Sequence, residues 1–229
     1  MIVGDRKPIE TIMSYLEGSE NILLAGCHGC VTVCCTGGQK EVDVLASIIE
    51  LARMRKHKAC KITKITLERQ CDPEFLVDLI EKAKDNDVIL SMACGAGVQL
   101  VAEKVGAKRV FPAIDTNFIG AIQEKGFWSE RCQTCGDCKL ALTGGICPVA
   151  MCAKGILNGP CGGAQDGKCE TSKERDCAWV MIVKRLTKQG KLSNLVNITP
   201  ARDFAKQSHP ARQVNEAYVK PKAEPAHSR

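Results

Sequence analysis

Fifteen cysteines in a chain of 229 residues constrain this protein more than any other feature of its sequence. Residues 1–10 carry four charged side chains and no apolar segment of the kind that directs secretion, which predicts a cytoplasmic protein. Because cytosolic thiols are kept reduced, metal sites explain so many cysteines better than disulfides do. With only four histidines, the ligands would be mainly thiolates, which suit iron-sulfur clusters or zinc.

Charge and composition argue against two other classes of protein. The formal net charge is +6, but residues 190–229 hold seven Lys or Arg against three Asp or Glu, so most of the excess lies in the tail. Aromatic residues make up only 4% of the chain, and nucleic-acid binding is therefore not predicted. The longest apolar runs, such as residues 21–25 and 88–92, are too short for membrane insertion.

The pattern of apolar residues predicts an α/β protein with three parts. Residues 1–126 alternate strand-like and helix-like segments, which is typical of a Rossmann-like parallel sheet. The predicted strands are 21–26, 61–68, 87–92 and 108–114, and the predicted helices are 39–56, 73–84 and 96–105. Asp72 is the expected cap of the second helix, with Pro73 as its first residue.

A small cysteine-rich domain is predicted over residues 127–189, followed by an extended basic tail over residues 190–229. The domain has many glycines and little apolar periodicity before a helix expected at 176–189, so it would need metal to fold. Trp179, Ile182 and Leu186 share one side of that helix, which would pack on its own domain. The tail is either a solvated segment or an arm that lies along a partner.

The cysteines of the first domain follow its predicted strands. Cys27 and Cys30 come after the first strand, Cys71 after the second and Cys94 after the third. Because loops after parallel strands share one edge of a sheet, these cysteines would converge there. We predict that Cys27, Cys30, Cys34 and Cys94 bind a [4Fe-4S] cluster, with Cys71 as the alternative fourth ligand.

Zinc is the competing metal at this first site, since it also binds four thiolates. Cys35 and Cys60 are given no role.

Eight further cysteines form a second group. The spacing C-x2-C-x2-C followed by Cys-Pro resembles half of a bacterial ferredoxin, although eight residues replace the usual three before the fourth cysteine. Eight thiolates can hold two four-ligand centres, and a zinc ribbon is the alternative for at least one of them. The pairing does not follow from the order of the residues. The predicted ligands are Cys132, Cys135, Cys138, Cys147, Cys152, Cys161, Cys169 and Cys177.

Short motifs in this second region resemble a known family. They are RCQTCGDC at 131–138, TGGICP at 143–148, NGPCGG at 158–163, GKCE at 167–170 and CAW at 177–179. Together they look like the cysteine-rich small subunit of bacterial methylenetetrahydrofolate reductase, as found in acetogenic bacteria. GCHGC at 26–30, CGAGVQ at 94–99 and PAIDT at 112–116 extend the resemblance into the first domain.

The resemblance implies an electron-transfer subunit with two or three [4Fe-4S] clusters, and zinc in place of one of them is the alternative. A separate large subunit carrying a flavin, expected to be FMN, would reduce methylenetetrahydrofolate to methyltetrahydrofolate, and a further protein could donate electrons. The residues agree, because no nucleophile with an adjacent base and no complete dinucleotide fingerprint is present. The chain would be inactive alone. The alternative is a zinc-stabilised interaction module without a redox role.

Overall fold

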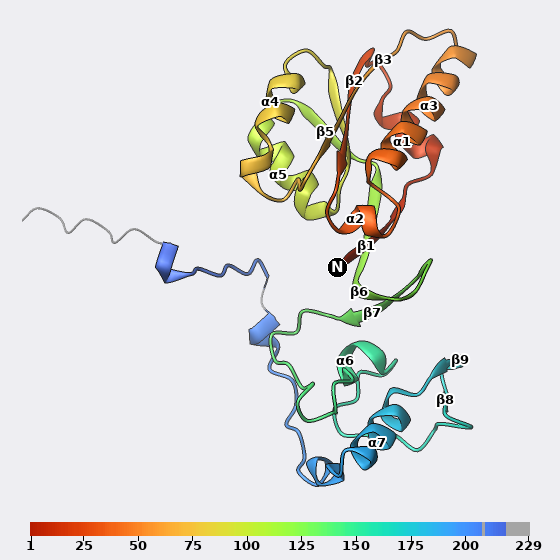
Figure 1. Cartoon of the computed structure of the whole chain (residues 1–229), viewed down its shortest axis with the longest axis vertical. Helices are drawn as coiled ribbons and strands as arrows, with labels where there is room; N and C mark the ends of the chain where they lie inside the picture. The colour runs from red at the N-terminus through yellow and green to blue at the C-terminus, as the bar shows by residue number, and fades with distance from the viewer. Residues whose placement is uncertain (208, 219–229) are drawn as a thin grey trace, which may run out of the picture. The chain divides into compact units, whose positions relative to one another are not determined.

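A computed structural model describes residues 1–207 and 209–218. The chain forms two compact units, Met1–Gln133 and Thr134–Arg229 (Figure 1). Within the described residues, no helix is long and apolar enough to cross a membrane.

The first unit is built on a parallel sheet of four strands, as the sequence predicted. The strands are β2 (Asn21–Cys27), β3 (Lys61–Leu67), β4 (Val88–Met92) and β5 (Arg109–Pro112), in the order β3-β2-β4-β5. Strands β2 and β4 are buried almost throughout, which explains their continuous apolar runs.

Helices cover both faces of this sheet (Figure 1). Alternate residues of β2 point to opposite sides, so Leu24 joins the apolar cluster that includes α1 (Ile9–Tyr15) and α3 (Gln39–Arg55). Leu23 joins the cluster with α4 (Val77–Ala83) and α5 (Gly95–Val105).

The helix expected at 73–84 is divided into two elements. A 3-10 turn, η1 (Pro73–Phe75), precedes α4, with Leu76 between them. The Asp72 carboxylate accepts a hydrogen bond from the Glu74 amide at 3.2 Å, which confirms the predicted cap.

A second, antiparallel sheet was not predicted from the sequence. It consists of β1 (Ile2–Arg6), β6 (Ile114–Glu124) and β7 (Phe127–Cys132), in the order β1-β6-β7. The strand expected at 108–114 instead ends at Pro112, and β6 begins after Ala113. The β7 residues, placed by sequence at the start of the cysteine-rich region, pair with β6 in the first unit.

The second unit has few regular elements. They are α6 (Pro148–Met151), the two-stranded β8 (Lys168–Cys169) and β9 (Ser172–Asp176), α7 (Ala178–Lys188) and η2 (Leu192–Leu195). Helix α7 lies within the predicted range, and its apolar side faces its own unit as expected. The buried residues of this small core are Ile146, Cys177, Trp179, Ile182 and Leu186.

Residues 192–207, here called the tail segment, are anchored to the second unit. The Asn158 side chain donates to the Thr199 carbonyl at 2.8 Å and accepts from its amide at 2.7 Å. Lys206 forms an ion pair with Asp137 at 3.2 Å. Beyond η2, the described tail holds only the 3-10 turns η3 (Phe204–Gln207) and η4 (Glu216–Tyr218). Residue 208 and residues 219–229, also part of the predicted tail, lie outside the described residues.

Candidate metal centres

The carboxyl edge of the parallel sheet brings three cysteine-bearing loops together. In the register of β2 with its neighbours, Cys27 lies opposite Leu67 of β3, and Gly26 lies opposite Met92 of β4. The three strands therefore end side by side, with β2 between β3 and β4. Cys71 and Cys94 lie in the loops that follow β3 and β4.

The thiols of Cys71 and Cys94 are close enough to Cys27 to act on its pKa. Burial raises the pKa of the Cys27 thiol, while backbone amides of Gly29 and Gln70 donate to it and oppose that rise. The nearby Cys71 and Cys94 thiols raise this pKa further, because neighbouring negative charges disfavour each other. A cation at this position would stabilise all three thiolates.

Gln70 holds the loop that carries Cys71 against the sheet. Its side chain is fully buried, and Nε2 donates to the carbonyls of Ala25 and Gly26 at 3.0 and 2.9 Å. The Ser91 hydroxyl donates to Gln70 Oε1 at 2.6 Å. The amide thus joins the ends of β2 and β4, and sequence analysis missed this role because no local pattern marks it.

Cys94 occupies the N-cap position of α5. The Gly95 amide donates to Thr116 Oγ1 at 2.9 Å. At Gly97, an added Cβ would lie only 2.9 Å from the Cβ atoms of both Ala93 and Gln70. The glycine therefore allows α5 to pack closely against the Cys71 loop.

The Cys34 side chain contacts the residues that flank it in the chain and the backbone of β1. It is buried, and its Sγ lies 3.2 Å from Thr36 Oγ1, 3.6 Å from the Val31 carbonyl and 3.9 Å from the Gly4 carbonyl of β1. The Cys34 side chain therefore has hydrogen-bond partners within the core. Cys71 and Cys94 are the thiols that act on the pKa of Cys27, and the role of Cys34 as a ligand stays a prediction.

The other first-unit cysteines differ in exposure. Cys30 is half-buried and begins the short helix α2 (Cys30–Val33), directly after the Cys27 loop. Cys35 is exposed, and Cys60 lies half-buried near Arg53 and Glu50. Burial raises the pKa of the Cys60 thiol, and Arg53 partly opposes this.

Three of the later cysteines lie at the ends of short elements around the small core. Cys147 is the N-cap of α6, where its Sγ accepts from the Ala150 amide at 3.4 Å, and Cys152 follows the same helix. Cys177 is the N-cap of α7 and is buried. Cys152 and Cys177 both belong to the apolar cluster of this unit.

The remaining cysteines of the group lie in loops or at strand ends. Cys132 ends β7, Cys161 is exposed, and Cys169 ends β8. Hydrogen bonds from the hydroxyl and amide of Thr171 lower the pKa of the Cys169 thiol, and nearby Arg175 and Lys154 lower it further.

The loop with Cys135 and Cys138 contacts the tail segment. Gly136 has a φ of +72°, and a Cβ there would lie 2.5 Å from the Lys206 carbonyl oxygen. Asp137 pairs with Lys139 at 2.9 Å and with Lys206, and both lysines hold the pKa of that carboxyl below its usual range. Two cations therefore lie close to this pair of thiols.

No disulfide joins the cysteines in the described part of the chain. Within residues 1–207 and 209–218, no three Cys, His, Asp or Glu side chains adopt the geometry of metal ligands. The donors at the carboxyl edge nevertheless suit an iron-sulfur cluster in their chemistry. They are thiols from separate loops, with backbone amides aimed at sulfur and glycines that allow close approach.

Comparison with known proteins gives one match. Residues 111–205 match the family model described as "Methylene-tetrahydrofolate reductase C terminal". The part of the chain from residue 111 to residue 205 is therefore similar to the C-terminal region of methylenetetrahydrofolate reductase. The matched region contains all eight cysteines from Cys132 to Cys177, whereas the candidate site at the carboxyl edge precedes it. Searches of curated proteins and of solved structures found no significant match.

The geometry of the carboxyl edge predicts which cysteines hold iron in the first unit. The single replacements Cys71→Ala and Cys94→Ala should each remove about four iron atoms per chain, because a cluster needs every thiolate ligand. Cys34→Ala is the matched control and should retain that iron. Iron analysis of anaerobically purified protein measures this. Loss of iron in Cys34→Ala together with retention in Cys71→Ala would restore the ligand set first predicted from sequence.

Metal removal should unfold the second unit before the first. The second unit has a small apolar core, so metal binding would supply much of its folding free energy. After chelation, amide hydrogen exchange should increase in residues 134–188 while β2 and β4 remain protected. Unchanged protection of residues 134–188 in the apo protein would contradict this.

Proposed function

We propose that this chain is the iron-sulfur electron-transfer subunit of a methylenetetrahydrofolate reductase complex. The observation that carries the proposal is that a cysteine-dense region, holding eight of the fifteen thiols, is matched to a reductase family. A second, independent group of thiols at the carboxyl edge of the sheet supports it. Two groups of thiolates in one chain suit a relay of redox centres.

In the first unit, Cys27, Cys30, Cys71 and Cys94 would hold a [4Fe-4S] cluster. Such a cluster accepts and donates single electrons. The amides of Gly29 and Gln70, which donate to Cys27 Sγ, would lower the negative charge felt at that sulfur. The buried amide of Gln70 would fix the position of the Cys71 loop during a change of charge.

In the second group, the eight cysteines from Cys132 to Cys177 would hold two four-thiolate centres. At least one would be an iron-sulfur cluster, and zinc could occupy the other. The thinness of the apolar core in this unit supports metal as a structural element.

The catalytic step belongs to a partner in this proposal. Reduction of methylenetetrahydrofolate requires a hydride, which a flavin can deliver and a cluster cannot. The partner would therefore be a flavin-bearing reductase subunit, supplied with electrons through this chain. A further protein would donate those electrons, and the complex would act in the cytoplasm.

The competing function is a zinc-stabilised interaction module. The scarcity of buried apolar side chains in the second unit fits structural zinc as well as it fits clusters. Broad absorption near 400 nm with stoichiometric iron supports the redox function, whereas a colourless zinc protein would overturn it.

The proposal predicts that the chain reduces no folate by itself. Purified anaerobically and chemically reduced, it should give no turnover of methylenetetrahydrofolate until the flavin-bearing subunit is added, because it has no hydride carrier. The partner without this chain, given the same reductant, is the control for direct flavin reduction. Substantial turnover by the lone subunit would exclude an accessory role.

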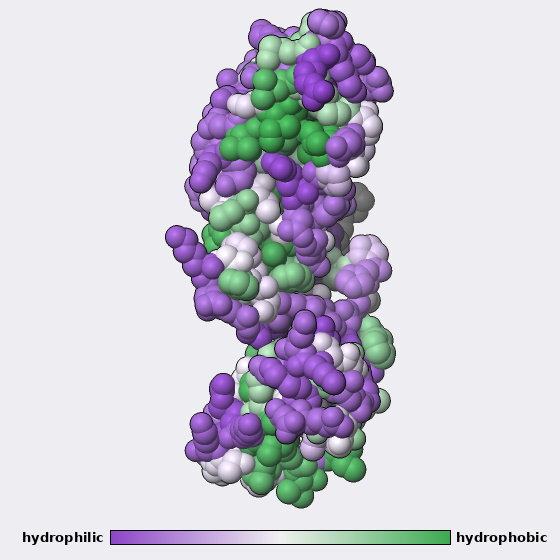
Figure 2. All heavy atoms as spheres, turned by 90° about the vertical axis from the view of Figure 1, so that its right-hand side faces the viewer, coloured by the Kyte–Doolittle hydropathy of each residue, from purple (hydrophilic) through white to green (hydrophobic). Residues whose placement is uncertain are grey.

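The tail segment provides a surface for this partner. Val196, Ile198 and Phe204 are 78%, 84% and 69% exposed, although the backbone around them is anchored at Thr199 and Lys206. Hydrophobic side chains accordingly appear on the surface of the second unit (Figure 2). A segment held in place with its apolar side chains outward loses little entropy on binding.

Polar substitution of the tail segment should weaken the complex. Changing Val196, Ile198 and Phe204 together to Ser should reduce affinity for the reductase subunit by about tenfold or more, since buried apolar area would be lost. Iron content should stay unchanged. Leu140→Ser, an exposed apolar position outside the tail segment, serves as the control. Equal affinity of the triple variant and the wild type in calorimetry would remove the tail segment from the interface.

A further inference from the structure

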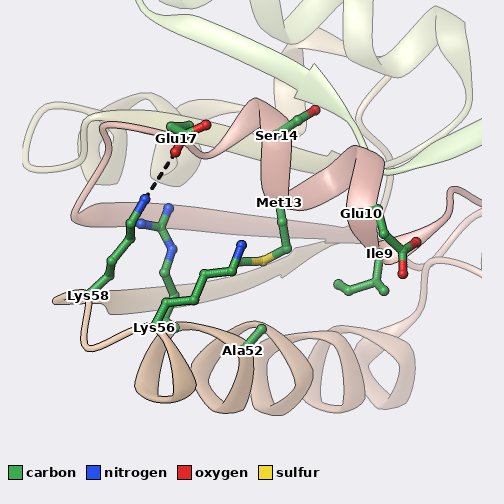
Figure 3. Close-up of a pocket in the computed structure, with 9 residues that line it drawn as sticks. Ile9, Glu10, Met13, Ser14, Glu17, Ala52, Lys56 and Lys58 are labelled. Atoms are coloured by element: carbon green, nitrogen blue, oxygen red, sulfur yellow. Dashed lines mark hydrogen bonds and ion pairs between the residues drawn. The ribbon is translucent and has the colours of Figure 1, made fainter.

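A pocket in the first unit lies between α1 and the last turns of α3, away from the cysteine edge. Its volume is about 350 Å³, within the range of small-molecule sites. Helix α1 leads into β2 and α3 leads into β3, so the pocket lies toward the amino ends of these strands. Figure 3 shows its lining residues, which are Ile9, Glu10, Met13, Ser14, Glu17, Ala52, Arg53, Lys56 and Lys58.

Arg53 is a buried cation on the wall of this pocket. The residue is 3% exposed, and its Nη2 donates to the Leu16 carbonyl at the end of α1. Its Nε is buried without a hydrogen-bond acceptor. Within the described residues, no carboxylate forms an ion pair with Arg53. The Glu17 carboxylate acts on Arg53 only at longer range and is already paired with Lys58, so a further anion at this wall would be stabilising.

Lys56 adds a second positive charge, which forms no ion pair in the described part of the chain, although the Glu17 carboxylate acts on it at longer range. Lys58 differs, because it forms an ion pair with Glu17 at 3.0 Å. Figure 3 shows this pair at one end of the pocket, Glu10 at the other end beside Ile9, and Lys56 between them near Met13. The middle of the pocket therefore combines an apolar surface with two cations, Arg53 and Lys56, whose acidic neighbour, Glu17, is already paired with Lys58.

The helix dipole explains only part of this arrangement. Cations in the last turn of α3 are favoured by its negative end, and Arg53 also ties α3 to the end of α1. Both roles are satisfied by the position of the guanidinium and its Nη2 bond. Neither uses Nε or requires an open pocket beside it.

We propose that this pocket binds a small organic anion, whose phosphate or carboxylate faces Arg53 and Lys56 and whose apolar part lies on Ile9 and Met13. Oxyanions form strong, charge-assisted hydrogen bonds with guanidinium and ammonium groups. The side chains of Ile9, Met13 and Ala52 give the apolar contact that inorganic ions cannot use. This site is independent of the metal centres.

The test measures binding of model anions to the full chain by anaerobic calorimetry at constant ionic strength. Phenyl phosphate and benzoate distinguish the two anionic groups, and benzyl alcohol is the uncharged control. Saturable binding of either anion, at least tenfold tighter than benzyl alcohol, is expected. Absence of saturable binding by both anions up to about 10 mM would overturn the proposal.

Variants locate the binding site. Lys56→Gln should weaken the binding of the preferred anion about tenfold, whereas Arg55→Gln should not. Arg55 is the matched control because it is exposed in the same helical turn and does not line the pocket. Met13→Ala should weaken the binding of phenyl phosphate or benzoate but leave any binding of inorganic phosphate unchanged. Equal weakening of anion binding by Lys56→Gln and Arg55→Gln would show non-specific charge attraction and overturn the proposal. This comparison needs no variant of the buried Arg53.

Discussion

The parallel pairing of β2 with both β3 and β4 is the constraint on which the first unit and its candidate metal site depend. Six of the seven residues of β2 are buried, and each fully buried aliphatic side chain contributes about 1.5–3 kcal/mol of hydrophobic stabilisation. Because parallel strands require a crossover connection, each one ends at the same edge before the chain turns back. Cysteines placed after these strands therefore meet, and Gln70 fixes the loop between them through hydrogen bonds to the ends of β2 and β4.

The second unit is organised by a different balance of forces. Its five-residue apolar cluster lies around one side of α7, and Trp179 completes its hydrogen bonding by donating to the Ile156 carbonyl at 2.9 Å. Cys147, Cys152 and Cys177 lie where α6 and α7 begin or end. Ligands at such positions would let a metal join elements that share little apolar surface, so folding and metal binding are coupled in the proposed function.

Residues with a strong local pattern were predictable, and residues that depend on distant partners were not. The apolar runs of β2 and β4 and the period of α7 predicted those elements. Strands β1 and β6 carry polar residues such as Asp5, Asp115 and Asn117, and they pair across more than 100 positions, which no local pattern reveals. The spacing C-x2-C-x3-C likewise grouped Cys34 with Cys27, but packing of α2 against β1 provides Cys34 with its own neighbours.

By itself, the sequence determined the parallel α/β class of the first unit, the helix at α7 and the resemblance to methylenetetrahydrofolate reductase, because these follow from periodicity and short motifs. Only the tertiary structure decided that the Gln70 side chain joins the ends of β2 and β4, and that Arg53 is buried beside an open pocket. The physical reason is that both arrangements join residues from separate elements. Their positions are fixed by packing and by buried hydrogen bonds such as those of Gln70, which act across the fold rather than along the chain.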